Sequence, residues 1–285
     1  DHRNGRECIK ASSLFHHTLY VSGSIVNITQ NTTCIWCGNK AGGRHVEHIV
    51  PEVLGCPPVF VLPAKVICQS CNNGLGHLDQ AVADDFDFVS FQAGIPRKKG
   101  RSPGITNRGN VYGFIGVNGP EILFNLDPSP IVAPDGQPVA AYRGYDRNIR
   151  PSFKKEGQYT QILFQVSFGQ VKKFQRGIYK IALSALAYFV GVNELYKRKY
   201  DKLRQYVCEG KGTRHFMVLA EDDSNGYFHT FAPPFVSPTG DYALEFRLAC
   251  VRFIVDLSES ESYLPAIVAT AKQEVGENGW TIVPS

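Results

Sequence analysis

The sequence predicts an α+β protein in two parts, a small module rich in cysteine and histidine followed by a larger mixed domain. Two Cys-x-x-Cys pairs, Cys34/Cys37 and Cys68/Cys71, stand near the start of the chain. Residues 171–192 carry apolar side chains at the spacing of one helix face. Strand-like runs separated by turn residues fill most of the sequence after residue 110. We therefore expect four segments: a strand-rich lead-in over 1–33, the cysteine module over 34–95, a basic linker or loop over 96–109, and an α+β domain over 110–285.

Length and composition limit the class of protein. The chain has 285 residues, of which 43% are hydrophobic, and this is ample for a packed core. Its apolar runs are shorter than the roughly 18 residues of a membrane span, so we expect a protein of the cytoplasm that contacts no membrane. Eight cysteines are too few for a disulfide scaffold and favour a reducing compartment. The formal charge of +4 is compatible with a polyanionic partner but does not by itself indicate one.

The two cysteine pairs predict a structural zinc site. Each pair offers two thiolates from one tight turn, and four thiolates complete the tetrahedral coordination that structural zinc adopts. Such a site leaves no open coordination position, which disfavours hydrolysis at this zinc. The metal would fix both ends of the loop-rich interval between Cys37 and Cys68, where we expect the chemistry to lie.

Within the module, the patterns predict two extended pieces and then a helix. Residues 44–50 favour a short strand that Pro51 ends, and residues 59–67 favour a second. After Cys71 apolar residues recur at spacings of three and four, so we expect a helix to about residue 90 that Asn72 or Asn73 caps.

The downstream domain is expected to be mostly strands around two helices. The helices are predicted over 171–192 and 194–207. In residues 243–257 the apolar phase shifts by one, which indicates a bulge or bend. The expected strands cover 111–117, 121–126, 137–145, 161–168, 215–221, 227–233, 243–257 and 280–285.

Residues 47–51 read Glu-His-Ile-Val-Pro, and residues 68–72 read Cys-Gln-Ser-Cys-Asn. Together these two motifs resemble the HNH endonuclease family. Its signature is an acidic residue, a histidine and hydrophobic-x-Pro, here Glu47 to Pro51, followed by Cys-x-x-Cys-Asn opening a helix, here Cys68 to Asn72. The resemblance implies a ββα-metal fold that cuts phosphodiester bonds in DNA with one divalent cation. Two departures are a glutamate where relatives more often have aspartate, and Pro63 where the family usually has its central asparagine. We interpret the second as a change of scaffolding.

The resemblance also implies roles for particular residues. His48 would be the general base, for which an imidazole has a suitable intrinsic pKa. Glu47 and Asn72 would hold Mg²⁺ or Mn²⁺ through oxygen, the donor atom that these ions prefer. His77 is a further catalytic candidate, and an Asn73/His77 pair one helical turn apart is an alternative or additional pair of ligands.

Basic residues outside the motif are candidates for contacts to the phosphate backbone. For residues 95–109, a solvated loop without nucleic-acid contact is an equal alternative. His45 could be a phosphate contact or a residue of the strand surface. The other candidates are Arg97, Lys98, Lys99 and Arg101, and the cluster of Arg143, Arg147, Arg150, Lys154 and Lys155.

These observations predict an endonuclease similar to restriction or phage-defence enzymes, in which residues 110–285 select or position the DNA. A homodimer would allow two sites to cut opposite strands. The alternative is a zinc-ribbon module without catalysis that binds nucleic acid or regulates another protein. The Glu47–Pro51 element favours the nuclease, because a purely structural ribbon does not need it.

Overall fold

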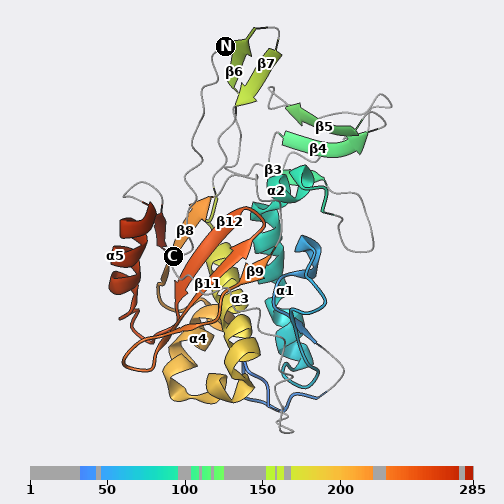
Figure 1. The fold of residues 1–285 in the computed structure, drawn as a ribbon. Coiled ribbons are helices and arrows are strands. Elements are labelled where there is room, and N and C mark those ends of the chain that lie inside the picture. Colours follow the sequence, from blue (N-terminus) through green and yellow to red (C-terminus); the bar gives the residue numbers. More distant parts are fainter. Residues whose placement is uncertain are drawn as a thin grey trace.

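A computed structural model describes residues 33–42, 46–95, 104–108, 111–116, 119–124, 152–157, 159–163, 168–220, 229–275 and 280–284. Over these residues the chain has the mixed α+β fold that the sequence predicted, and its largest sheet is a central antiparallel one (Figure 1). Within the described part of the chain, no helix is long and apolar enough to cross a membrane.

The cysteine module has the predicted order of strand, strand and helix. Strand β1 (Glu47–His48) pairs antiparallel with β2 (Val61–Leu62), and a short 3-10 turn, η1 (Glu52–Leu54), lies between them. Helix α1 (Gln69–Asp85) follows, and a shorter helix, α2 (Asp87–Gln92), extends to the predicted end. Leu75, Leu78 and Val82 of α1 are buried, which confirms the predicted apolar face.

Helix α1 begins earlier than the sequence predicted. Its N-cap is Cys68, not Asn72 or Asn73, and the Cys68 sulfur accepts a hydrogen bond from the backbone N–H of Cys71 at 3.4 Å. The sulfur thus satisfies a donor that a capping side chain would otherwise have to satisfy. The second Cys-x-x-Cys pair is therefore itself the first turn of α1.

The downstream part is built on a six-stranded sheet in the order β10-β11-β12-β8-β13, with β9 paired to β11. The predicted long helix is present as α3 (Lys172–Val190). Side chains alternate across the strands, so Phe216 and Phe253 face the large core that includes α3, whereas Met217 and Ile254 face a smaller cluster with α5 (Leu264–Val275). The strands are β8 (His215–Ala220), β9 (Thr230–Phe231), β10 (Phe235–Val236), β11 (Tyr242–Leu248), β12 (Val251–Asp256) and β13 (Thr281–Pro284).

Three downstream features differ from the prediction. The run over 243–257 is a hairpin of β11 and β12, and its two-residue turn at Ala249 and Cys250 causes the phase shift that suggested a bulge. The helix expected over 194–207 is split into η3 (Val192–Tyr196), η4 (Arg198–Tyr200) and α4 (Asp201–Glu209), because Lys197 has an extended backbone. Helix α5 was not anticipated.

Two smaller antiparallel sheets lie apart from the central one (Figure 1). One contains β3 (Ile105–Arg108), β4 (Val111–Gly116) and β5 (Gly119–Phe124). Strands β4 and β5 match the strands predicted over 111–117 and 121–126, whereas β3 lies in the segment 96–109 that was expected to be a linker or loop. The other is a hairpin of β6 (Ser152–Glu156) and β7 (Tyr159–Leu163). Strand β7 includes the start of the strand expected over 161–168, of which residues 164–167 lie outside the described residues. The strand expected over 137–145 and residues 1–32 of the expected lead-in lie outside the described residues.

One hydrophobic core joins the cysteine module to the downstream part, running from Cys34 through α1 and α3 to the central sheet. The contact between the helices is close at Gly177 of α3. A Cβ atom at this position would lie 2.5 Å from Val82 Cγ2 and 3.0 Å from the Leu78 carbonyl oxygen, both in α1. This approach brings the middle of α3 against α1 and β1.

Candidate functional site

The four predicted cysteines converge on one point. The sulfur atoms of Cys34, Cys37, Cys68 and Cys71 all lie within 4.8 Å of one another, and those of Cys37 and Cys68 are 3.7 Å apart. Around a tetrahedral zinc with Zn–S bonds of about 2.3 Å, sulfurs are about 3.8 Å apart. The cluster can therefore bind a metal ion such as zinc.

Backbone hydrogen bonds hold the first pair in place. The N–H of Gly38 donates to the Cys34 carbonyl at 2.9 Å, and the N–H of Ile35 donates to Val66, just before the second pair. Burial raises the pKa of the Cys71 thiol, and charge on Cys34 raises it further. Four thiolates so close together require a cation, which supports metal binding as the purpose of the cluster.

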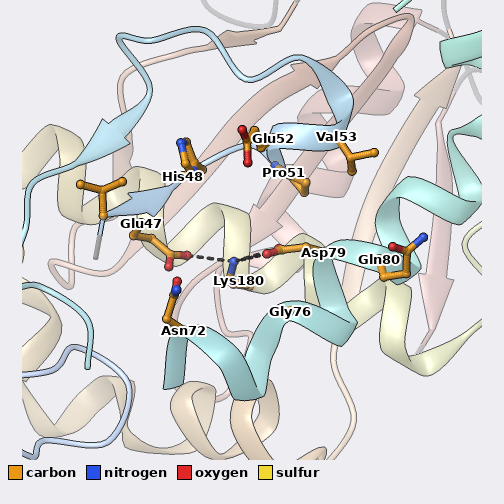
Figure 2. A pocket seen from close by; sticks show the side chains of 11 residues that line it. Glu47, His48, Pro51, Glu52, Val53, Asn72, Gly76, Asp79, Gln80 and Lys180 are labelled. Atoms are coloured by element: carbon orange, nitrogen blue, oxygen red, sulfur yellow. Dashed lines mark hydrogen bonds and ion pairs between the residues drawn. The ribbon is translucent and has the colours of Figure 1, made fainter. Parts of the chain in front are cut away.

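A cavity of about 450 Å³ lies at the junction of three elements, and the side chains that line it are drawn in Figure 2. The predicted residues Glu47, His48 and Asn72 all line it, although His48 and Asn72 are 24 positions apart in the sequence. The principal polar contributions are Glu47, His48 and Glu52 from β1 and the turn after it, Asn72, Asp79 and Gln80 from α1, and Lys180 from α3.

Helix α1 presents one face to this cavity. Asn72, Gly76 and Asp79 stand at positions i, i+4 and i+7 and share that face. A Cβ atom on Gly76 would meet nothing within 4 Å, so the space above this residue is open. Glycine costs helix stability relative to alanine, and here its effect is to leave room between Asn72 and Asp79.

Glu47 is held beneath the cavity with only 2% of its surface exposed. Its Oε1 pairs with Lys180 Nζ at 2.9 Å and accepts a hydrogen bond from Ser184 Oγ at 3.3 Å. Burial raises the pKa of Glu47, and the charge of Lys180 opposes this rise. Figure 2 shows the Asn72 side chain pointing toward the Glu47 carboxylate, so the two predicted metal ligands face each other.

Lys180 is a site residue that the sequence interpretation missed. It is buried in α3, and its Nζ also bonds both carboxylate oxygens of Asp79, at 2.8 and 3.0 Å. Burial alone would lower the pKa of Lys180, but Glu47 and Asp79 outweigh it and the pKa is raised. The available signals were a lysine between the apolar residues Tyr179 and Ile181, and the i+7 spacing of Asp79 from Asn72.

His48 is half-buried and follows Glu47 on β1, so the strand directs the two side chains to opposite sides. Figure 2 shows His48 directed away from the Glu47–Lys180–Asp79 cluster, on the same side as Glu52. The base candidate is therefore separated from the carboxylates that hold the lysine.

His77 and Asn73 do not line the cavity. Both are exposed, and the Nδ1 of His77 lies 2.7 Å from the carbonyl oxygen of Gly74 in its own helix. The structure thus brings Asn72, and neither of the alternative ligands, to the predicted site.

Most of the residues predicted to contact nucleic acid lie outside the described residues. Lys154 and Lys155 belong to β6, and Lys155 is exposed. The others, outside the described part, are His45, Arg97, Lys98, Lys99, Arg101, Arg143, Arg147 and Arg150.

The chemistry of the cavity favours a cation. Three carboxylates, those of Glu47, Glu52 and Asp79, line it together with one ammonium group, and Asn72 adds an amide oxygen. Oxygen donors of this kind suit Mg²⁺ or Mn²⁺, which keep several water ligands. Comparison of the chain with protein-family models, with curated proteins and with solved structures finds no match.

Proposed function

We propose that the chain is a metal-dependent endonuclease of the HNH type that hydrolyses phosphodiester bonds in DNA. The observation that carries the proposal is that Glu47, His48 and Asn72, the three residues of the sequence motif, line one cavity. The four-cysteine cluster supports it, because Asn72 directly follows Cys71 in the first turn of α1.

Hydrolysis of a phosphodiester needs a base for water and positive charge at the phosphate. His48 lines the cavity and would take the proton of the attacking water. A divalent cation, when bound, would stabilise negative charge on the phosphate and the leaving oxygen. Glu47 and Asn72 would hold it, and their oxygen donors fit Mg²⁺ or Mn²⁺.

The zinc would act on this site through the backbone. The N–H of Asn72 donates to the carbonyl of Cys68 at 2.9 Å, so a metal that holds Cys68 and Cys71 would also fix the position of Asn72. Loss of zinc would then disturb the site without changing any residue that touches DNA.

A second candidate, a zinc-held binding module without catalysis, is favoured by one observation. Glu47 is 2% exposed and already carries an ion pair with Lys180, which is an arrangement that also occurs where a carboxylate has only a structural role. The two functions differ in the effect of replacing His48, because a nuclease would lose its DNA cleavage and a binding module has no cleavage activity.

The decisive assay is cutting of supercoiled plasmid in EDTA, Mg²⁺ or Mn²⁺ by the wild-type protein, His48→Ala and His77→Ala. The His77 variant is a matched control, because His77 is exposed and lies outside the cavity. We expect metal-dependent nicking that falls about 100-fold or more in His48→Ala and persists in His77→Ala.

Absence of metal-dependent cutting by the wild-type protein would favour the binding module. Equal cutting by the wild-type protein and His48→Ala would refute the proposed base. Loss of cutting in His77→Ala alone would show that the exposed histidine, not the cavity, carries the activity.

A further inference from the structure

The ammonium group of Lys180 lies between two carboxylates of the proposed metal site. One nitrogen atom bonds Glu47 Oε1 at 2.9 Å and the two oxygens of Asp79 at 2.8 and 3.0 Å. The carboxylates come from β1 and α1, and the lysine comes from α3, 101 residues after Asp79. The gap between the two acids is therefore spanned by a single cationic atom.

The surroundings of this nitrogen resemble those of a bound metal ion. Two carboxylates approach it from different elements, and Figure 2 shows the Asn72 side chain directed toward the same region. A divalent cation held by Glu47 and Asn72 would lie close to the ammonium group, and two such cations repel each other strongly at this depth. Lysine and metal therefore compete for the same oxygens.

We propose that the ammonium group of Lys180 occupies the cation position of this site in the metal-free protein. When a divalent cation displaces this ammonium group, Asp79 joins Glu47 and Asn72 as an oxygen ligand of the metal. The inference rests on the proposed function, since it assigns two more residues to the metal site of that function. Helix α3, which lies outside the cysteine module, would then set the affinity of the site for metal.

The exposure of the two acids supports an exchange of cations. The Asp79 side chain is 32% exposed, whereas the side chains of Glu47 and Lys180 are 2% and 4% exposed. An entering cation would meet Asp79 first, and its entry would loosen the hold of Asp79 on the ammonium group. Glu47, which lies deeper than Asp79, would exchange the ammonium group for the metal ion and would never be left without a cationic partner. An unpaired charge would be costly for a buried carboxylate.

The test is Mn²⁺ binding by isothermal titration, together with thermal melting, on zinc-loaded full-length protein. Lys180→Met keeps the length and apolar volume of the side chain but removes its charge. We expect Mn²⁺ affinity to rise at least about tenfold, because the competing cation is gone. Without Mn²⁺ the melting temperature of Lys180→Met should be several degrees below that of the wild-type protein. Saturating Mn²⁺ should raise the melting temperature of the variant by more than it raises that of the wild-type protein.

Ser184→Ala is the matched control. Ser184 lies one turn beyond Lys180 on α3 and contacts the same Glu47 oxygen, but it carries no charge. We expect its Mn²⁺ affinity to stay within about threefold of wild type, since only a neutral hydrogen bond is lost. A rise equal to that of Lys180→Met would mean that loosening of Glu47, and not competition, controls affinity, and would overturn the proposal.

Asp79→Asn keeps the test decisive if Lys180→Met does not fold. The amide oxygen can still accept from Lys180, but the ligand charge is lost, so we expect Mn²⁺ affinity to fall at least about tenfold. Unchanged affinity in Asp79→Asn, or weaker binding in a folded Lys180→Met, would overturn the inference. Failure of the wild-type protein itself to bind Mn²⁺ would instead refute the proposed function.

Discussion

Gly177 controls the contact between α1 and α3 that delivers Lys180 to the candidate site. In Gly177→Ala the added Cβ would lie 2.5 Å from Val82 Cγ2 and 3.0 Å from the backbone oxygen of Leu78. Valine is restricted at χ1 and a backbone carbonyl cannot rotate away, so the helices must separate. Because Lys180 lies one turn beyond Gly177, the same movement draws it away from Asp79.

Two opposing effects determine the size of the change. Alanine is favoured over glycine in a helix interior by about 1 kcal/mol, whereas overpacking of a close contact costs about 1–3 kcal/mol or more. We expect the clash to dominate because one of the two atoms belongs to the backbone, and we expect a net loss of about 1–2 kcal/mol. In a chain of this size that corresponds to a melting temperature lower by about 2–3 °C.

Thermal melting of Gly177→Ala, Val82→Ala and the double variant tests this reasoning. Truncating Val82 removes the 2.5 Å contact, so Val82→Ala should destabilise the protein less in the Gly177→Ala background than in the wild type. Gly74→Ala is the control, because a Cβ at Gly74 meets nothing within 4 Å and should raise stability. An unchanged or higher melting temperature for Gly177→Ala would refute the account of the helix contact.

Two further predictions concern the cavity wall and a half-buried histidine. Gly76→Leu should lower the rate of plasmid nicking at least about tenfold, because Gly76 lines the cavity. Gly74→Leu should leave the rate within about threefold of wild type, because Gly74 does not line the cavity. Equal rates for the two variants would contradict an open substrate space above α1. His229 is half-buried, with Nε2 2.7 Å from the Leu54 carbonyl oxygen and Nδ1 accepting from the Ala249 N–H, and its partial burial lowers its pKa below the usual 6.5. As pH falls, the unfolded chain binds a proton at this residue before the folded chain does, so His229 contributes stability above pH 6.5 that is lost as pH falls further. In chemical denaturation, the free energy of unfolding should therefore decrease less on acidification in His229→Gln than in the wild-type protein. An equal decrease would contradict this account.

Local patterns were sufficient to predict the parts of the fold that local chemistry determines. The spacing of the cysteines follows from what four metal ligands require, and the strand, strand and helix of the module follow from short apolar runs and the period after Cys71. The long helix α3 was predictable because a sustained 3.6-residue period identifies a helix wherever it packs.

Other features depend on contacts that no local pattern contains. The Lys180–Asp79 pair joins residues 101 positions apart, and only the packing of α3 on α1 at Gly177 brings them together. Asparagine is a common N-cap, so the sequence favours Asn72 or Asn73 at the start of α1, whereas the sulfur of Cys68 caps the helix in the structure.

The central claim is that the chain has two metal positions of different chemistry, a thiolate cluster and an oxygen-lined cavity. Anomalous diffraction from crystals grown with Mn²⁺, with data collected on both sides of the zinc edge, tests it most directly. The account predicts a zinc peak among Cys34, Cys37, Cys68 and Cys71 and a manganese peak in the cavity against Glu47 and Asn72. A cavity without manganese at saturating Mn²⁺, or four cysteines without zinc, would contradict it.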